Sequence, residues 1–574
     1  MLRSLVDSML HHRLIVVVVG AILLVFGVQA ARKLSVDAFP DVTNVQVQIA
    51  TEAAGRSPEE VERFVTVPIE IAMTGIPRLT EMRSLIKPGL SIVTLVFEDG
   101  TDVYLARQLV MERLAEARGR LPENVTPVLG PVSSALGEVY QYTLEHPDDG
   151  ERPLSKAELT ERRIVQDWVV RPLLRSIPGV AEINSTGGYV RQYQVLPDPM
   201  KLRSYDVTLN DVTRALYNNN SNSGGGILPQ GAEQYLVRGV GLIQSLDDIR
   251  NIILKEVSNT PVYLRDVAEV RFGEEVRYGA MVKGGYTEAV GGIVMMIAGG
   301  NAKEIVGRVQ ERVEEINSRG MLPDGYRIVP YYDRSELVDA ALWTVSKVLM
   351  EGIVLVVIVL FLFLGDLRSS IIVIATLILT PLATFIIMNH VGLSANLMSL
   401  GGLAIAIGLM VDGSVVVVEN VFEKLSHGPP ANRLRTILDA VLEVGTPVIF
   451  GITVIILVFL PLMTLEGMEG KMFSPLAYTI AIALGISLVL SLTLSPVLSA
   501  YLLKGSGEHD TILIRVLKRP FSAVLGLALR NEKRTIATAL VLFAASISLF
   551  PLLGTSFIPE MREEIGRASC RERV

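Results

Sequence analysis

The chain has 574 residues, of which 50% are hydrophobic and 20% are charged, and its formal net charge is -7 at pH 7. This mixture indicates membrane spans that alternate with sizeable water-exposed segments. The acidic balance and the lack of a basic block argue against nucleic acid as a partner. The single cysteine, Cys570, excludes an intrachain disulfide and a thiolate metal cluster.

Seven stretches are long and apolar enough to cross a bilayer as helices. Lys and Arg are concentrated at the amino terminus and in alternate connections, so the positive-inside rule places the amino terminus in the cytoplasm and the large segment 33–344 outside. An alternative interpretation of the first stretch is a signal peptide, because residues 28–30 (VQA) could be a cleavage site. The seven stretches are residues 14–31, 345–364, 371–388, 397–418, 444–463, 476–503 and 536–553.

The segment outside the membrane has the pattern of a mixed α/β domain. Residues 45–50 alternate as a strand does, Ser57 starts a helix with a capping box that Pro68 should interrupt, two strands follow, and Asp102 caps a second helix before a last strand. The resulting order is β-α-β-β-α-β, which is the ferredoxin-like unit. The same order recurs over residues 139–330, interrupted by an insertion at about 198–285. Its loop 218–226, rich in Asn and Gly, is either a flexible tip or a subunit-docking arm.

The fourth apolar stretch carries one acid, Asp412, and Glu419 follows at its edge. A carboxylate at membrane depth costs roughly 3 kcal/mol or more, so proteins keep one where it faces a bundle interior and couples transport to protons or ions. The alternative is a protonated structural Asp. Glu419 is seven residues further along, so it shares a helix face with Asp412, although it could also be a solvated charge at the helix end.

Met398 and Met410 lie on the same stretch and are candidate metal ligands. Thioethers suit soft Cu(I) and Ag(I) ions, and the alternative is that both methionines fill an apolar core. The sequence has no nucleotide-binding loop, no His/Cys metal spacing and no nucleophile arrangement, so we predict neither an enzyme nor a cofactor.

Several short segments carry a resemblance to a known family: residues 37–48 (DAFPDVTNVQVQ), 57–62 (SPEEVE), 96–102 (VFEDGTD), 137–143 (GEVYQYT) and 408–420 (GLMVDGSVVVVEN). On these the chain resembles the resistance-nodulation-division (RND) efflux pumps, and their heavy-metal branch in particular. The drug-exporting branch usually has two adjacent acids where this chain has Asp412 and Gly413. Some members that export divalent metals have an acid at the position of Ala406, which leans the expectation toward Cu(I) or Ag(I).

The resemblance implies proton-driven efflux of heavy-metal cations, either Cu(I)/Ag(I) or Zn/Co/Cd, across a bacterial inner membrane. The metal would be the substrate and the proton the coupling ion, with Asp412 and Glu419 as the proton relay. Such pumps are homotrimers that work with a periplasmic adaptor and an outer-membrane channel, and their main metal methionines lie in a second periplasmic domain. Alternatives are an RND multidrug or solvent exporter, or a protein-export or sterol-sensing-type membrane protein.

The predicted organisation combines a membrane α-helical bundle with an α+β periplasmic domain. A basic pair, a span and a hydrophobic-Pro-acid exit occur at both His12-Arg13 and Lys533-Arg534, which indicates a tandem repeat beginning its second copy. The predicted parts are transmembrane helix 1 (1–32), porter subdomain 1 (33–133), porter subdomain 2 (134–337) with a docking insertion (198–285), transmembrane helices 2–6 (338–503), a cytoplasmic amphipathic connection (504–535), transmembrane helix 7 (536–553), and the start of a truncated second periplasmic domain with a non-native tail (554–574).

Overall fold

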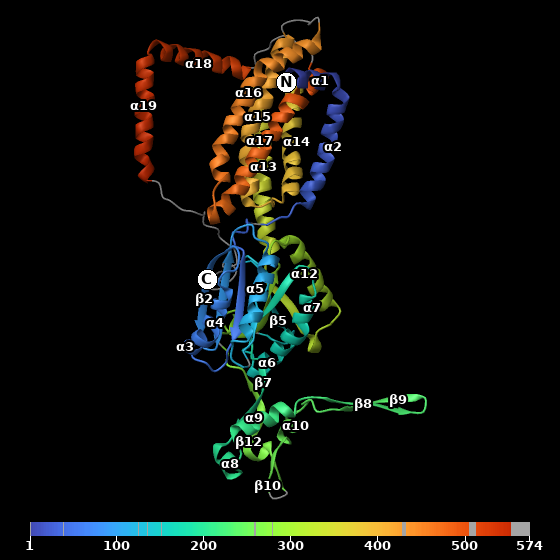
Figure 1. Cartoon of the computed structure of the whole chain (residues 1–574). Coiled ribbons are helices and arrows are strands. Elements are labelled where there is room, and N and C mark those ends of the chain that lie inside the picture. Colours follow the sequence, from blue (N-terminus) through green and yellow to red (C-terminus); the bar gives the residue numbers. More distant parts are fainter. Residues whose placement is uncertain are drawn as a thin grey trace.

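The computed structural model describes residues 2–552 apart from residues 38, 124, 135, 151, 258–259, 278, 365, 427–431 and 504–511. The predicted second periplasmic domain and tail, 554–574, lie outside these residues. Figure 1 shows a helical bundle at one end, a mixed α/β region in the middle and a small distal part with a long hairpin at the far end.

Each predicted apolar stretch overlaps a helix. Among the residues described, five helices are long and apolar enough to cross a membrane, and a sixth, α13, has a shorter apolar part at Met350–Val359. Figure 1 shows α18 extending sideways from the end of the bundle where the amino terminus lies, and α19 standing apart from the bundle. The helices are α2 (Arg13–Lys33), α13 (Arg334–Leu364), α14 (Leu367–Val391), α15 (Leu397–Ser426), α16 (Arg433–Met463), α17 (Gly467–Leu502), α18 (Ile512–Arg530) and α19 (Glu532–Leu549).

Several helices extend beyond the predicted stretches, and one helix was not predicted. A separate helix, α1 (Leu2–His11), precedes α2, and its Val6 and Leu10 are buried against the bundle. Helix α17 begins at Gly467, so Lys471, which precedes the predicted stretch 476–503, lies in a helix.

Helices α15 and α17 approach one another closely. A Cβ atom added to Gly402 of α15 would lie 2.7 Å from the backbone carbonyl oxygen of Leu476 in α17. Further along, the Ser487 hydroxyl of α17 donates a hydrogen bond of 3.0 Å to the backbone oxygen of Met410. Small residues permit this contact between backbones, as is common for helices in membranes. The two helices therefore form one tightly packed pair.

We predict that Gly402→Ala destabilises the protein by about 1–3 kcal/mol, because the added methyl group would have to displace the α17 backbone. Gly401→Ala is the matched control, since no atom lies within 4 Å of its added Cβ, and alanine favours helix by about 1 kcal/mol over glycine. Unfolding of the purified chain in detergent measures both variants. Equal stability of the two variants would contradict the close α15–α17 contact.

The first α/β subdomain has the element order β-α-β-β-α-β. Ser57 forms the predicted capping box with Glu60, and Asp102 caps the second helix. All neighbours in its four-stranded sheet, of order β2-β3-β1-β4, are antiparallel. The elements are β1 (Gln46–Glu52), α3 (Pro58–Val61), η1 (Glu62–Thr66), α4 (Val67–Met73), β2 (Leu79–Lys87), β3 (Leu90–Phe97), α5 (Val103–Arg118) and β4 (Pro127–Leu129).

The predicted interruption at Pro68 takes the form of a π-helical turn, η1, that ends two residues before the proline. The second subdomain repeats this arrangement, with η2 (Gln166–Val170) directly before α7 (Arg171–Arg175) and its Pro172. Proline has no N–H to donate within the helix, which disturbs the regular hydrogen bonds of the preceding turn.

The second α/β subdomain is discontinuous in sequence. Strand β14 pairs with β5, β6 and β13, and β5 pairs with β15 on its other side. Strand β15 leads directly into α13, whose first turn is capped by Asp333. The elements are β5 (Glu138–Glu145), α6 (Lys156–Val165), η2, α7, β6 (Val180–Gly187), β13 (Met281–Lys283), β14 (Thr287–Met296), α12 (Ala302–Ser318) and β15 (Arg327–Asp333).

Between β6 and β14 the chain forms the distal part, joined through the antiparallel pair β7 (Arg191–Pro197) and β12 (Ala268–Glu274). Residues 223–226 of the predicted Asn/Gly-rich loop begin a strand, and the hairpin of β8 (Ser223–Gln230) and β9 (Glu233–Gly239) is exposed along its whole length. It extends as an arm in Figure 1. The other elements are α8 (Pro199–Ser204), α9 (Leu209–Asn218), α10 (Leu246–Arg250), β10 (Ile253–Val257), β11 (Thr260–Tyr263) and α11 (Leu264–Val267).

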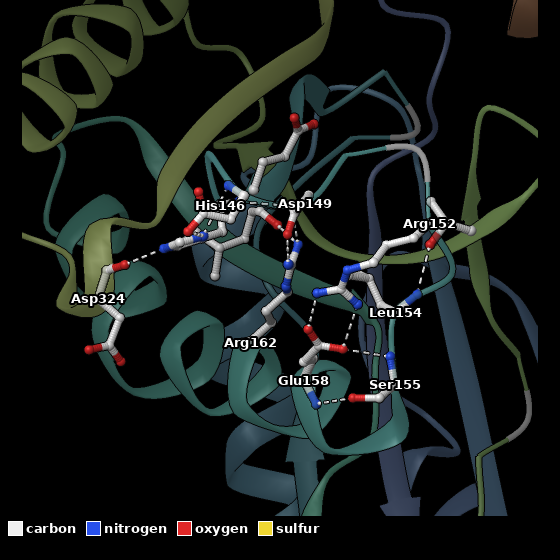
Figure 2. Close-up of polar contacts among 12 residues, drawn as sticks. His146, Asp149, Arg152, Leu154, Ser155, Glu158, Arg162 and Asp324 are labelled. Carbon is white, nitrogen blue, oxygen red and sulfur yellow. Dashed lines mark hydrogen bonds and ion pairs between the residues drawn. The ribbon is translucent and has the colours of Figure 1, made fainter.

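A buried arginine organises one corner of the second subdomain (Figure 2). The Arg162 side chain is 4% exposed and pairs with Asp149, to which its Nη1 donates a hydrogen bond of 2.8 Å. The same nitrogen donates to the backbone oxygen of Leu144. Burial alone would raise the pKa of Asp149, but hydrogen bonds from Arg162 and from the backbone N–H of His146 outweigh it and hold that pKa below its ordinary value.

A second charged pair caps α6 beside this corner. Arg152 Nη1 donates to Glu158 Oε2 at 3.1 Å, and Glu158 also accepts the backbone N–H of Ser155 at 2.7 Å (Figure 2). The Arg152 and Ser155 hydrogen bonds lower the pKa of Glu158. Both carboxylates are therefore bound in their ionised form.

We predict that Asp149→Asn makes the protein less stable at pH 7 and flattens its loss of stability in acid. Because the folded-state pKa of Asp149 lies below the unfolded value, its contribution is present above about pH 4 and is lost as the pH falls through the folded pKa. Unfolding at pH 7 and pH 3 measures the effect. Asp148→Asn, whose side chain is 89% exposed, should keep the wild-type profile, and a wild-type profile in Asp149→Asn would contradict this assignment.

Candidate functional site

Asp412 lies on an uncovered face of α15. The exposed residues of this helix recur every three or four positions, and Asp412 and Glu419 lie on the same stripe, as their spacing predicted. The opposite side of α15 is buried among the other spans. Members of the exposed stripe are Ile405, Gly408, Asp412, Val416 and Glu419.

The expectation that Asp412 faces the interior of the bundle is wrong for the helices described, because none of them covers this face. No hydrogen bond or ion pair joins the Asp412 or Glu419 carboxylate to another residue in the described part of the chain. A charged group at membrane depth requires a partner, water or a proton. Asp412 can therefore bind a proton or pair with a cation that approaches this open face.

Polar contacts hold α15 in place behind the acid. The Thr376 hydroxyl of α14 donates to the Ser414 hydroxyl at 3.1 Å, and both residues are buried. Together with the bond from Ser487 to the Met410 backbone, this fixes α15 against α14 and α17 on either side of position 412. The acid thus sits on a well-supported helix while its own face stays open.

Asn420, next to Glu419, ties the carboxyl-terminal half of α15 to α16. Its side-chain amide donates to the backbone oxygen of Ala440 at 2.8 Å and more weakly to Glu443. Glu443 also pairs with Lys424 at 3.1 Å. Asn420 lies in one of the sequence segments that carry the family resemblance. Its contact with α16 was not predictable, because the spacing of residues along α15 does not show which helix lies beside it.

The structure does not bring the two candidate methionines together. Met410 is 2% exposed within an apolar cluster, and Met398 lies twelve residues earlier on α15. At 1.5 Å per residue they are separated by about 18 Å along the helix, so they cannot share one ion. Within the described residues there is also no group of three His, Cys, Asp or Glu side chains that could hold a metal.

A buried ion pair at the mouth of the bundle was missed in the sequence. Arg334, at the start of α13, is 4% exposed, lies 2.8 Å from Asp37 and also donates to the backbone oxygen of Leu136. It thereby joins the exit from α2, the junction of the two subdomains and the entry into α13. Asp37 stands in one of the segments that carry the family resemblance, which was the only available signal.

Comparison with known proteins decides the family. The AcrB/AcrD/AcrF family model matches residues 5–569. This chain belongs to that family. It is 43% identical to the cation efflux system protein CzcA of Alcaligenes sp. (strain CT14), a match covering 94% of this chain and 51% of CzcA. It is 37% identical to the cation efflux system protein CusA of Escherichia coli (strain K12), covering 98% of this chain and 54% of CusA.

The three-dimensional match agrees with this assignment. A crystal structure of a heavy metal efflux pump superposes with a TM-score of 0.82 at 35% identity, covering 97% of this chain and 53% of that pump. The predicted membership of the heavy-metal RND permeases is confirmed. This chain spans about half the length of the curated relatives that it matches.

We predict that Met398→Leu and Met410→Leu, separately and together, leave Ag(I) binding by the purified chain unchanged, because the two thioethers are about 18 Å apart along α15 and cannot bind one ion together. The Met410 change conserves volume in the apolar cluster and should cost less than about 1.5 kcal/mol. Equilibrium dialysis with Ag(I) measures binding. Loss of a bound ion in either variant would restore that methionine as a ligand.

Proposed function

We propose that this chain is the part of a heavy-metal cation exporter in which proton binding is converted into movement of the membrane helices. The observation that carries the proposal is the position of Asp412 in the middle of a span. Its own face of α15 is exposed, and the opposite face is held to α14 and α17 by hydrogen bonds. The family membership and the names of the relatives support cation export as the outcome.

Protonation of Asp412 would act through desolvation. The ionised side chain disfavours an apolar neighbour by roughly 3 kcal/mol or more, and the neutral side chain does not. Each proton taken up from outside therefore changes which packing of the α15 face is preferred, and its release to the cytoplasm restores the first packing. Glu419 lies on the same face nearer the cytoplasmic end and would pass the proton on.

The open face of α15 requires a second set of helices in the working pump. We propose that these supply a basic residue facing Asp412, as relatives about twice as long have room for such a set. The working unit would be a homotrimer in a bacterial inner membrane, joined to a periplasmic adaptor and an outer-membrane channel. The exposed β8–β9 arm is suited to contact a neighbouring subunit, and the strand orders support two ferredoxin-like porter subdomains.

The cargo would be Cu(I) or Ag(I) before Zn, Co or Cd. Ala406 is fully buried in the apolar cluster around Met410, so α15 offers no second acid on that side for a divalent ion. Ligands for the cargo would come largely from parts of the pump other than this chain.

We predict that Asp412→Asn in a full-length pump carrying this chain abolishes resistance to Ag(I), copper and Zn(II), because the amide cannot change its charge. Membrane level and trimer assembly should stay as in the wild type. Growth on graded metal concentrations, with immunoblots and crosslinking, measures this. Full resistance in the variant would remove Asp412 from the proton path.

We also expect the 574-residue chain alone to give no resistance, because nothing in its described part faces Asp412. Expression in a metal-sensitive strain, with the full-length pump as the positive control, tests this. Protection by the chain alone would show that the uncovered face is sufficient for coupling.

A further inference from the structure

One lysine joins the bundle to the first α/β subdomain. Lys471, in the first turns of α17, lies with its ammonium nitrogen 2.6 Å from Asp99 Oδ1. The same nitrogen donates to the backbone oxygen of Thr43 and to Asn44 Oδ1, both at 3.1 Å. A lysine has three N–H donors, so all three are used on this subdomain.

The three acceptors are placed at the ends of the two central strands. Thr43 and Asn44 come just before β1, and Asp99 comes just after β3, its neighbour in the sheet. The lysine therefore holds the base of the sheet itself. A displacement of the α17 end by a few ångströms would break these bonds or move the sheet.

Around this contact the two parts are separated by a cavity of about 780 Å³. Asp41, Glu98 and Asp99 line it from the subdomain, and Glu466 lines it from the bundle. Lys471 is the one Lys or Arg among the described residues that line it. Because the contact crosses a cavity, packing around it contributes little to holding the two parts together, and removing the lysine would leave four carboxylates facing one another.

Lys471 is connected to the acid through the α15–α17 pair. Leu476, five residues further along α17, is the residue whose backbone touches Gly402 of α15, and Ser487 is bonded to the α15 backbone at Met410. These contacts lie before and beside Asp412 on α15. Movement of α15 along its axis must therefore carry α17, and with it the lysine.

We propose that Lys471 is a positioning residue that transmits movement of the α15–α17 pair to the first α/β subdomain. Proton binding at Asp412 would thereby move the base of the sheet in that subdomain. This inference rests on the proposed function, since it needs Asp412 to drive the helices. Lys471 would couple proton binding to movement of the subdomain and would bind neither the proton nor the cargo.

The test uses a full-length pump carrying this chain in proteoliposomes, with Ag(I) or Zn(II) as the cargo and a proton gradient across the membrane. Proton entry and cation export are recorded together. In Lys471→Ala we expect proton entry to persist while cation export falls at least tenfold, because the helices still respond but the sheet no longer follows. Lys471→Arg, which keeps a cation and its donors, should restore export.

Lys283→Ala is the matched control, because Lys283 forms a comparable pair, of 2.5 Å with Glu145, inside the second subdomain; it should leave both fluxes unchanged. Wild-type export in Lys471→Ala would overturn the inference while leaving the proposed function standing. Loss of proton entry together with export in that variant would also overturn it, since the lysine would then serve the proton path or the fold. A wild-type pump that exports cations without moving protons would overturn the proposed function and this inference together.

Discussion

A carboxylate in an apolar helix must be protonated, paired with a cation or in contact with water, and this constraint governs the arrangement around Asp412. The described helices hold α15 in place but supply no partner for the acid. Hydroxyl groups and small residues fix α15 against α14 and α17 behind the acid, while the face that bears Asp412 and Glu419 is left uncovered by the described helices. An acid held in this way can bind a proton or pair with a cation that reaches its exposed face.

The contacts between the bundle and the α/β region give that response a route outward. Three connections are prominent: α13 continues directly from a strand of the second subdomain, Arg334 joins α13 to the exit of α2, and Lys471 joins α17 to the first subdomain. The first two bind the subdomains to helices at the edge of the α15–α17 pair. The third connects to that pair itself, which makes it the most direct path from Asp412.

Local features were predictable from the sequence because they depend on neighbours along the chain. The Ser57 capping box, the Asp102 cap and the shared face of Asp412 and Glu419 were confirmed, as were five of the seven predicted apolar spans. The membership of the heavy-metal RND permeases followed from short segments. The proline at position 68 indicated an interruption, although its form as a π-helical turn depended on packing.

Features that depend on distant segments were not predictable. Lys471 binds residues more than 370 positions earlier in the chain, and its place on a helix was obscured because α17 begins before its apolar stretch. The open face of Asp412 depends on which helices surround α15. The burial of Met410 in an apolar cluster likewise depends on residues from other helices.

The most direct test of the account is the charge state of Asp412 itself. Infrared difference spectroscopy of the membrane-reconstituted pump, compared with Asp412→Asn, would identify the carbonyl stretch of its protonated carboxyl group. We expect this band to appear and disappear as the proton gradient is applied and reversed. A band that is always present, or one that never appears, would contradict the claim that this acid changes its protonation during transport.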